Sequence, residues 1–97
     1  MFECDGTTYE LAYGRKRLES AEAMIGGSVI QTFRGMPTIR QLVSVMACGM
    51  RREGESGWMN PKQALAVAET HVEEAGLMTA YQEVTEALDR DCGFLFR

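Results

Sequence analysis

The longest apolar stripe in this chain lies between Met36 and Met50. Apolar residues recur there with the spacing of a helical face, and they are Ile39, Leu42, Val43, Met46 and Met50, widened by Val45 and Cys48. Thr38 and Gln41 have the spacing of a capping box, and Pro37 in the first turn is the alternative start of the helix. The run is too short to cross a bilayer, which needs about 20 apolar residues. We therefore expect the buried central helix of a small domain.

Alternation of apolar and polar residues near the amino terminus predicts a β-hairpin from Phe2 to Ala12. Its turn is Asp5-Gly6, a pair that tolerates the positive φ angles of a two-residue hairpin loop. A helix is expected next, over 15–25, with Gly26-Gly27 as its stop. The following segment, 28–35, is either a short helical turn or a packed loop.

Two further helices are predicted after a polar, glycine-rich loop at 51–59. Asn60 as N-cap and Pro61 at N1 mark the start of the first, with Gln63 placed to return a bond to the cap. Gly76 is the expected C-cap of that helix, and Thr79 is the expected start of the next one. The expected buried stripes of the outer helices are Leu18, Ala21, Met24 and Ile25; Leu65, Ala68, Val72 and Ala75; and Tyr81, Val84 and Leu88. These patterns predict a single α+β domain over residues 1–97, with an N-terminal β-hairpin packed on a small bundle of about four α-helices.

Charge and cysteine content narrow the class of protein. Ten Lys and Arg against 14 Asp and Glu give a formal net charge of −4, which disfavours a general binder of the nucleic-acid backbone. The three cysteines are widely separated and form no C-x-x-C pair, so we expect reduced thiols in a cytoplasmic protein. No basic segment followed by an apolar run stands near the amino terminus, so we expect no signal peptide and no membrane partner.

No cluster of residues predicts catalysis, a metal site or a cofactor. His71 is the only histidine, and we expect it on a helix surface rather than as a ligand or general base. The acidic residues at 83–91 scatter around a helix without the spacing of a calcium-binding loop. Cys48 and Cys92 have no histidine near them in sequence, which disfavours a nucleophilic role. We therefore expect a non-enzymatic protein without a cofactor.

Two basic clusters, at 15–17 and 51–52, keep a small DNA-binding regulator open as an alternative function. The helix-turn-helix would have to run from Arg15 to Met50, but the link between its helices is about eleven residues long instead of three or four. Arg51 and Arg52 also suit the carboxyl end of the central helix, where cations interact favourably with the helix dipole. DNA binding therefore remains a secondary hypothesis.

The remaining signal concerns apolar residues outside the predicted stripes. The candidate partner-binding residues are Trp58, Met59, Phe94, Leu95 and Phe96. Seven methionines add side chains that adapt to varied apolar surfaces. One interpretation is that these residues cap the core. The other is that they form a binding face for a partner helix or a second copy of the chain.

Four features, taken in order, carry a resemblance to a known family. They are the hairpin around Asp5-Gly6, the helix Leu18 to Ile25 with its stop at Gly26-Gly27, the central pattern from Ile39 and Leu42 to Gly49-Met50-Arg51, and the two helices at Asn60 to Ala75 and Thr79 to Leu88. In this order they resemble the phage tail assembly chaperones of the gene-transfer-agent type. The resemblance covers nearly the whole chain.

The resemblance implies a protein made during infection or prophage induction in the bacterial cytoplasm. Such a chaperone binds the tape-measure protein and keeps it soluble until tail-tube subunits polymerise around it. The implied partners are the tape-measure protein, the tail-tube protein and further copies of the chain in a homo-oligomer. A virion structural part, such as a head–tail connector or a tail-completion protein, is the alternative within the same biology.

Overall fold

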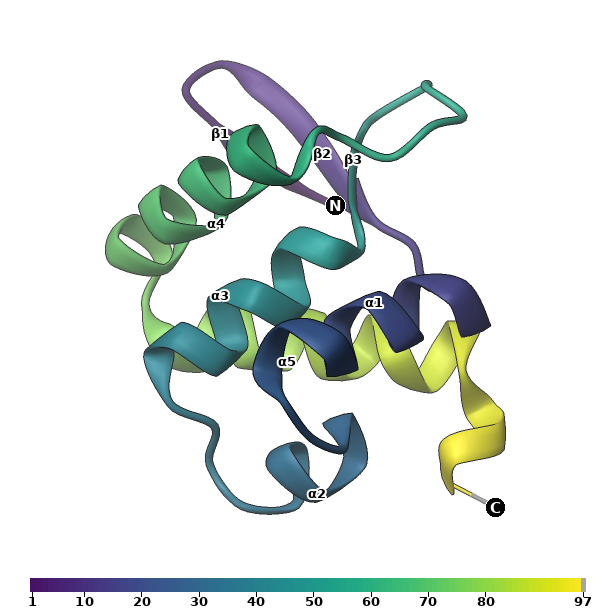
Figure 1. Ribbon diagram of the computed structural model, residues 1–97. Helices are drawn as coiled ribbons and strands as arrows, with labels where there is room; N and C mark the ends of the chain where they lie inside the picture. Colours follow the sequence, from purple (N-terminus) through teal and green to yellow (C-terminus); the bar gives the residue numbers. More distant parts are fainter. Residues whose placement is uncertain (97) are drawn as a thin grey trace.

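The computed structural model describes the backbone of residues 1–96 and the side chains of residues 1–95. The elements are β1 (Phe2–Cys4), β2 (Thr7–Leu11), α1 (Arg15–Ile25), α2 (Val29–Arg34), α3 (Ile39–Cys48), β3 (Met50–Arg52), α4 (Pro61–Ala75), α5 (Leu77–Asp91) and the 3₁₀ helix η1 (Gly93–Phe96). The sheet lies at one end of the molecule, and the helices extend away from it (Figure 1). The predicted α+β fold, with an N-terminal hairpin packed on helices, is confirmed.

The hairpin forms as the sequence predicts. Strands β1 and β2 pair antiparallel, with Phe2 opposite Tyr9. Asp5 and Gly6 between them have φ angles of 50° and 79°, the positive values that a tight two-residue turn requires. The alternation also holds, because the apolar side chains of both strands are buried in the core, where β1 packs on α4.

The segment after the central helix differs from the prediction of a loop at 51–59. Its first part is strand β3, which completes a three-stranded antiparallel sheet in the order β1-β2-β3. Met50 lies opposite Leu11 and is fully buried, and the Arg51 guanidinium contacts the Glu10 carboxylate at 2.6 Å. A three-residue strand carries no period of its own, so only its pairing with the distant strand β2 defines it.

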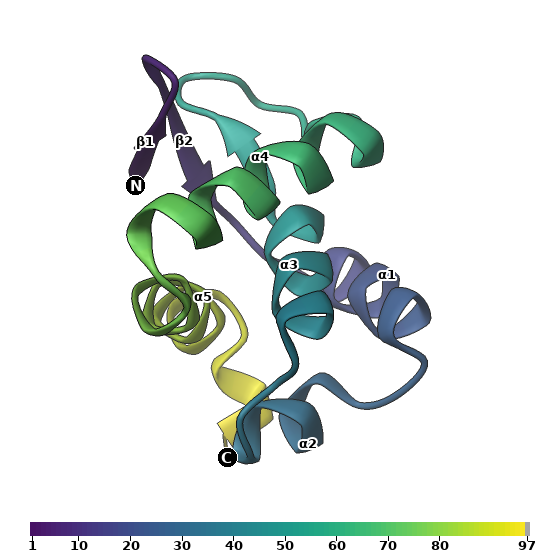
Figure 2. The ribbon, with the colours of Figure 1, turned by 90° about the vertical axis from the view of Figure 1, so that its left-hand side faces the viewer.

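Helix α3 is the centre of the fold, as expected. It packs most extensively on α4 and α1, and Figure 2 shows it between α1 and α5. Its residues from Leu42 to Cys48 are all buried. The capping box is present, because the Thr38 hydroxyl accepts from the Gln41 N–H at 3.1 Å and the Gln41 side chain accepts from the Thr38 N–H at 2.9 Å. Among residues 1–96, no helix has both the length and the apolar character needed to cross a bilayer.

The segment at 28–35, predicted as a helical turn or a packed loop, forms the short helix α2. Ser28 is the N-cap of α2, where its hydroxyl accepts from the Gln31 N–H at 3.3 Å. Val29 is buried, and Phe33 stacks on the Tyr81 ring of α5 with 5.7 Å between ring centroids. A six-residue helix is too short to be stable alone, so this packing against α5 holds it in place.

The predicted start of α4 at Asn60-Pro61 is confirmed, but one bond of its cap and the start of α5 differ from the prediction. Asn60 caps α4, but its side chain accepts from the Lys62 N–H at 2.9 Å, and no returning bond from Gln63 is present among the described residues. Helix α5 begins at Leu77, two residues before the expected start at Thr79. Gly76 serves both helices, since it ends α4 with φ 100° and its carbonyl accepts the first bond of α5 from Ala80.

The contact between Tyr13 and Gly49 joins the hairpin to α3, and the sequence pattern gave no sign of it. The Tyr13 hydroxyl donates to the Val45 carbonyl at 2.7 Å, and its ring covers Gly49 so closely that a Cβ at position 49 would overlap it. Burial raises the pKa of the Tyr13 phenol well above its ordinary value, so the hydroxyl remains a donor.

Candidate functional site

The side chain of Trp58, a predicted partner contact, is fixed by contacts within the chain. Its indole N–H donates to the Ala12 carbonyl at 2.9 Å. The guanidinium carbons of Arg17 and Arg51 lie 5.3 Å and 5.7 Å from the centre of its ring, within cation–π distance. The side chain is 40% exposed, but these contacts fasten the β3–α4 loop to the end of β2. Met59 beside it is buried in the core, so its side chain is not accessible to a partner.

The carboxyl-terminal candidates lie elsewhere. Phe94 is 54% exposed on η1, whereas Leu95 is partly buried against the core and lines a small cavity of about 300 Å³ with Val29 and Leu88. The Phe96 side chain lies outside the described residues. The β3–α4 loop lies at the sheet end of the molecule and η1 at the other end (Figures 1 and 2). The predicted residues therefore do not form one surface.

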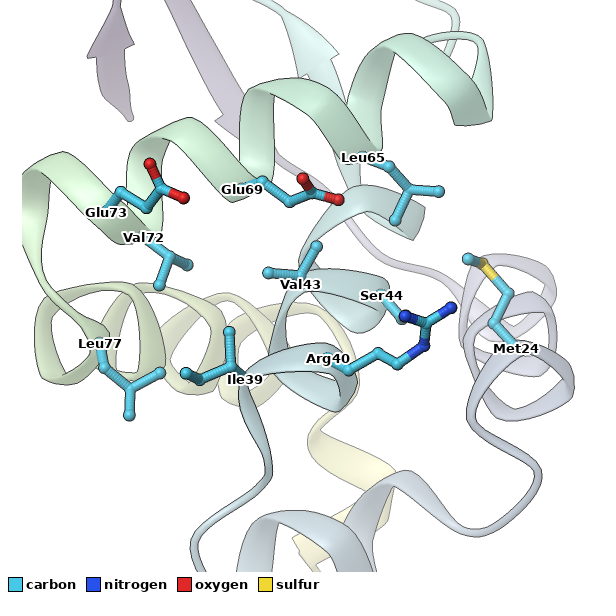
Figure 3. A pocket seen from close by; sticks show the side chains of 10 residues that line it. All are labelled: Met24, Ile39, Arg40, Val43, Ser44, Leu65, Glu69, Val72, Glu73 and Leu77. Atoms are coloured by element: carbon cyan, nitrogen blue, oxygen red, sulfur yellow. The ribbon is translucent and has the colours of Figure 1, made fainter.

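A larger apolar groove lies on another face. Side chains from α1, α3, α4 and α5 enclose about 830 Å³, and the lining residues are Met24, Ile39, Arg40, Val43, Ser44, Leu65, Glu69, Val72, Glu73 and Leu77. Figure 3 shows α4 along one side, carrying Glu73, Glu69 and Leu65 in succession. Ile39 and Arg40 of α3 lie on the opposite side, and Leu77 and Met24 mark the two ends.

The groove exists because the apolar stripes of its helices do not close over one another. Val43 and Val72 are buried at its base, with 4% and 8% of their surfaces exposed. Ile39 continues the stripe of α3 to the start of the helix, yet it is 61% exposed, and Met24 of α1 is 44% exposed. We expected both side chains in the core, and the structure places them at the edge of the groove instead.

Charged side chains flank the apolar surface on both sides. Glu69 and Glu73 are exposed on the α4 side, and Arg40 is exposed on the α3 side. Across the side chains described for residues 1–95, none of the three forms an ion pair or a side-chain hydrogen bond. Two glutamates at an i,i+4 spacing repel each other and destabilise an isolated helix by about 0.2–0.5 kcal/mol. The groove therefore combines apolar surface with exposed charges at its rim.

The predicted position of His71 on a helix surface is wrong, because its side chain is buried. Its Nε2 atom lies 2.6 Å from a carboxylate oxygen of Glu83, and its ring centre lies 4.2 Å from that of Phe2. This cluster joins α4, α5 and β1 in the core. The sequence signal was its place near the buried stripe of α4, one residue before Val72.

Cys4, Asp5 and Glu74 bring three possible metal-ligand atoms within 4.8 Å of one another. Burial, together with the negative charges of Asp5 and Glu74, raises the pKa of the Cys4 thiol. A raised pKa favours the protonated thiol over the thiolate, which is the metal-binding form. Cys48 and Cys92 are also free, buried, and raised in pKa, with burial as the first cause. These environments suit structural thiols better than reactive ones.

The last turn of α5 is attached to the sheet by a charged cluster. Asp91 accepts from the Tyr13 N–H at 2.9 Å and from the Arg90 guanidinium at 2.8 Å, and Arg90 also donates to the Leu11 carbonyl. The bond from Arg90 is the main cause that lowers the pKa of the Asp91 carboxyl, against the opposing effect of burial. This cluster fixes the fold and lies outside the groove.

Comparison of this chain with known family models, with curated proteins and with solved structures found no match.

Proposed function

We propose that this protein is a phage or prophage tail assembly chaperone that binds the tape-measure protein and keeps it soluble during tail assembly. The observation that carries the proposal is the apolar groove formed by α1, α3, α4 and α5, with charged side chains at its rim. An apolar groove between helices is a surface that can receive the apolar face of an amphipathic helix. The resemblance described above supplies the identity of the client.

The groove suits the binding of a long, helical tape-measure protein. A tape-measure protein with long amphipathic helices exposes apolar stripes that aggregate in water until the tail tube encloses them. A groove that receives one face of a helix buries such a stripe by the helix-in-groove mode. Met24 at its edge is unbranched and adapts to different side chains, which suits a client with many similar helices.

The proposed action is stoichiometric and non-enzymatic. Each copy of this small domain covers only a short stretch of the client, so many copies act on one tape-measure chain, and self-association along the client accompanies binding. The tail-tube protein is the second proposed partner, because it replaces the chaperone as the tube grows. The proposed location is the cytoplasm of the bacterial host, where tails assemble.

The DNA-binding alternative receives less support from the basic residues. Arg17 donates to the Cys48 carbonyl at 2.7 Å, and Arg51 contacts Glu10 at 2.6 Å. Both guanidiniums also lie near the Trp58 ring. These side chains are engaged within the protein, and the net charge of −4 opposes approach to a phosphate backbone.

The test is co-expression with the tape-measure protein encoded by the same phage or prophage. We expect an otherwise insoluble tape measure to remain soluble and to co-purify with many copies of this protein. Mass spectrometry of purified particles should then find the protein absent from the virion. Its presence there, without rescue of the client, would favour a head–tail connector or tail-completion protein instead. A gel shift at low salt tests the DNA-binding regulator in the same preparation.

A further inference from the structure

We infer that the groove binds one amphipathic helix aligned with α4, and that two cationic side chains on the edge of this helix pair with Glu69 and Glu73. This inference deepens the proposed function, on which it rests, by naming the class of client segment. The α4 side of the groove runs from Leu65 to Glu73 (Figure 3). The eight residue steps from Leu65 to Glu73 span about 12 Å of helix, or about two turns. The groove therefore receives about two turns of a helix at a time.

The spacing of the two glutamates defines the spacing of their partners. Glu69 and Glu73 are one turn apart, about 6 Å along the helix axis. A bound helix that runs alongside α4 presents residues three or four apart at the same interval. Lys or Arg at these two positions would relieve the repulsion between the glutamates. The ion pairs would form beside an apolar surface, where they are screened less than in open solvent.

The opposite side of the groove carries the opposite charge. Arg40 of α3 lies across from the glutamates of α4, and Ile39 beside it is 61% exposed. A helix with cations on one edge of its apolar stripe and an anion on the other edge is complementary to both sides. The opposite charges on the two sides of the groove therefore favour one orientation of the bound helix over the reverse one.

A second copy of the chain does not fit this site. Among the helices described within residues 1–96, none carries two Lys or Arg residues three or four positions apart. The basic residues of α1 are consecutive, at 15–17, and α4 and α5 carry one each, Lys62 and Arg90. Charge complementarity therefore favours a different protein over self-association at the groove.

The test uses two fluorescein-labelled helical peptides of about 18 residues, long enough for five turns. Both carry the same apolar stripe at i, i+3, i+4 and i+7. The edge of one peptide has Lys at two positions four apart, and the edge of the other has Glu there. Fluorescence anisotropy measures Kd for each peptide with the wild type and with the variant Glu69→Lys/Glu73→Lys. The variant Glu53→Lys/Glu55→Lys makes the same change of net charge in the exposed β3–α4 loop and serves as the matched control.

We expect the wild type to prefer the Lys-edged peptide about tenfold at about 50 mM salt, with the preference shrinking at high salt. The groove variant should invert the preference, and the loop control should keep it. The inference is overturned if neither peptide binds, or if the groove variant and the loop control discriminate alike.

Co-expression of the same variants with the tape-measure protein separates this inference from the proposed function. If the preference between the peptides depends on Glu69 and Glu73 but the wild type leaves the tape measure insoluble, the groove inference stands and the chaperone function fails. If the wild type keeps the tape measure soluble while the peptides show no charge preference, the chaperone function stands and the groove inference fails. Circular dichroism of both variants confirms that the exposed substitutions leave the fold intact.

Discussion

Ile39→Asp is the substitution that best separates client binding from folding. Ile39 is the first residue of α3, lines the groove and is 61% exposed. Burying an isoleucine side chain completely contributes about 1.5–3 kcal/mol. Since about two-fifths of its surface is buried in the folded chain, the substitution costs roughly 0.6–1.2 kcal/mol of folding free energy. The new carboxylate in the first turn of the helix offsets about 0.3–1 kcal/mol of this loss in folding free energy through the helix dipole.

The same substitution has a larger effect on binding. A client helix would cover the exposed three-fifths of Ile39, which contributes roughly 1–2 kcal/mol of apolar burial. The variant loses this contribution and places a carboxylate against the apolar stripe, which costs about another 1 kcal/mol or more. The combined loss of about 2–3 kcal/mol corresponds to a Kd roughly 30-fold to 150-fold higher.

Two measurements on the same protein preparation check this reasoning. Thermal unfolding followed by circular dichroism should show a Tm within about 8 °C of the wild type, because the net change in folding free energy is about 1 kcal/mol or less. Anisotropy titration with the Lys-edged peptide should show the rise in Kd. An unchanged Kd would remove Ile39 from the binding surface and refute the assignment of the groove. A large fall in Tm would instead assign Ile39 to the core.

Three further predictions concern contacts that hold the fold together outside the groove. Gly49→Ala should destabilise the protein by about 2–3 kcal/mol in urea unfolding, because the new methyl group overlaps a buried tyrosine ring, whereas Gly57→Ala, which points into open space, should be nearly neutral. Trp58→Phe removes an indole N–H donor and should cost about 1 kcal/mol of stability without weakening client binding; weaker binding at unchanged stability would make this side chain a partner contact after all. Asp91→Asn should cost about 1 kcal/mol at pH 7, and the difference from the wild type should shrink below about pH 4, because Arg90 lowers the pKa of the folded carboxyl and this stabilisation is lost as pH falls through that value. A difference that stays constant from pH 7 to pH 3 would exclude the ionised pair as its source.

The local signals in the sequence predict most of the fold. The Asp5-Gly6 turn, the Thr38–Gln41 capping box and the Asn60 N-cap each specify a boundary within a few residues, and the structure has all three. The error at β3 has a cause that is distant in sequence, whereas the error at the start of α5 has a local one. Strand β3 depends on pairing with β2, and α5 starts early because Gly76 links two helices without a separate loop.

The candidate site was harder to predict for the same physical reason as strand β3. Periodicity identifies Met24, Ile39 and Leu65 as residues of apolar helix faces. It does not show where the faces of neighbouring helices leave a groove between them. Trp58 illustrates the reverse case. It looked like an exposed aromatic residue in a loop, and its partners Ala12 and Arg17 lie about 40 residues away in sequence, where no local pattern connects them.

Site-specific photo-crosslinking would identify both the client of this protein and the surface that binds it. A photoreactive phenylalanine analogue replaces Ile39, Phe94 or Glu55 in separate variants, each co-expressed with the tape-measure protein and irradiated in the cell. These positions sample the groove, η1 and the exposed β3–α4 loop. We expect a crosslink to the tape-measure protein from position 39 and none from position 55. Crosslinks from position 94 alone would show that the client binds at η1 and not in the groove. The absence of any crosslink to the tape measure would contradict the chaperone function itself.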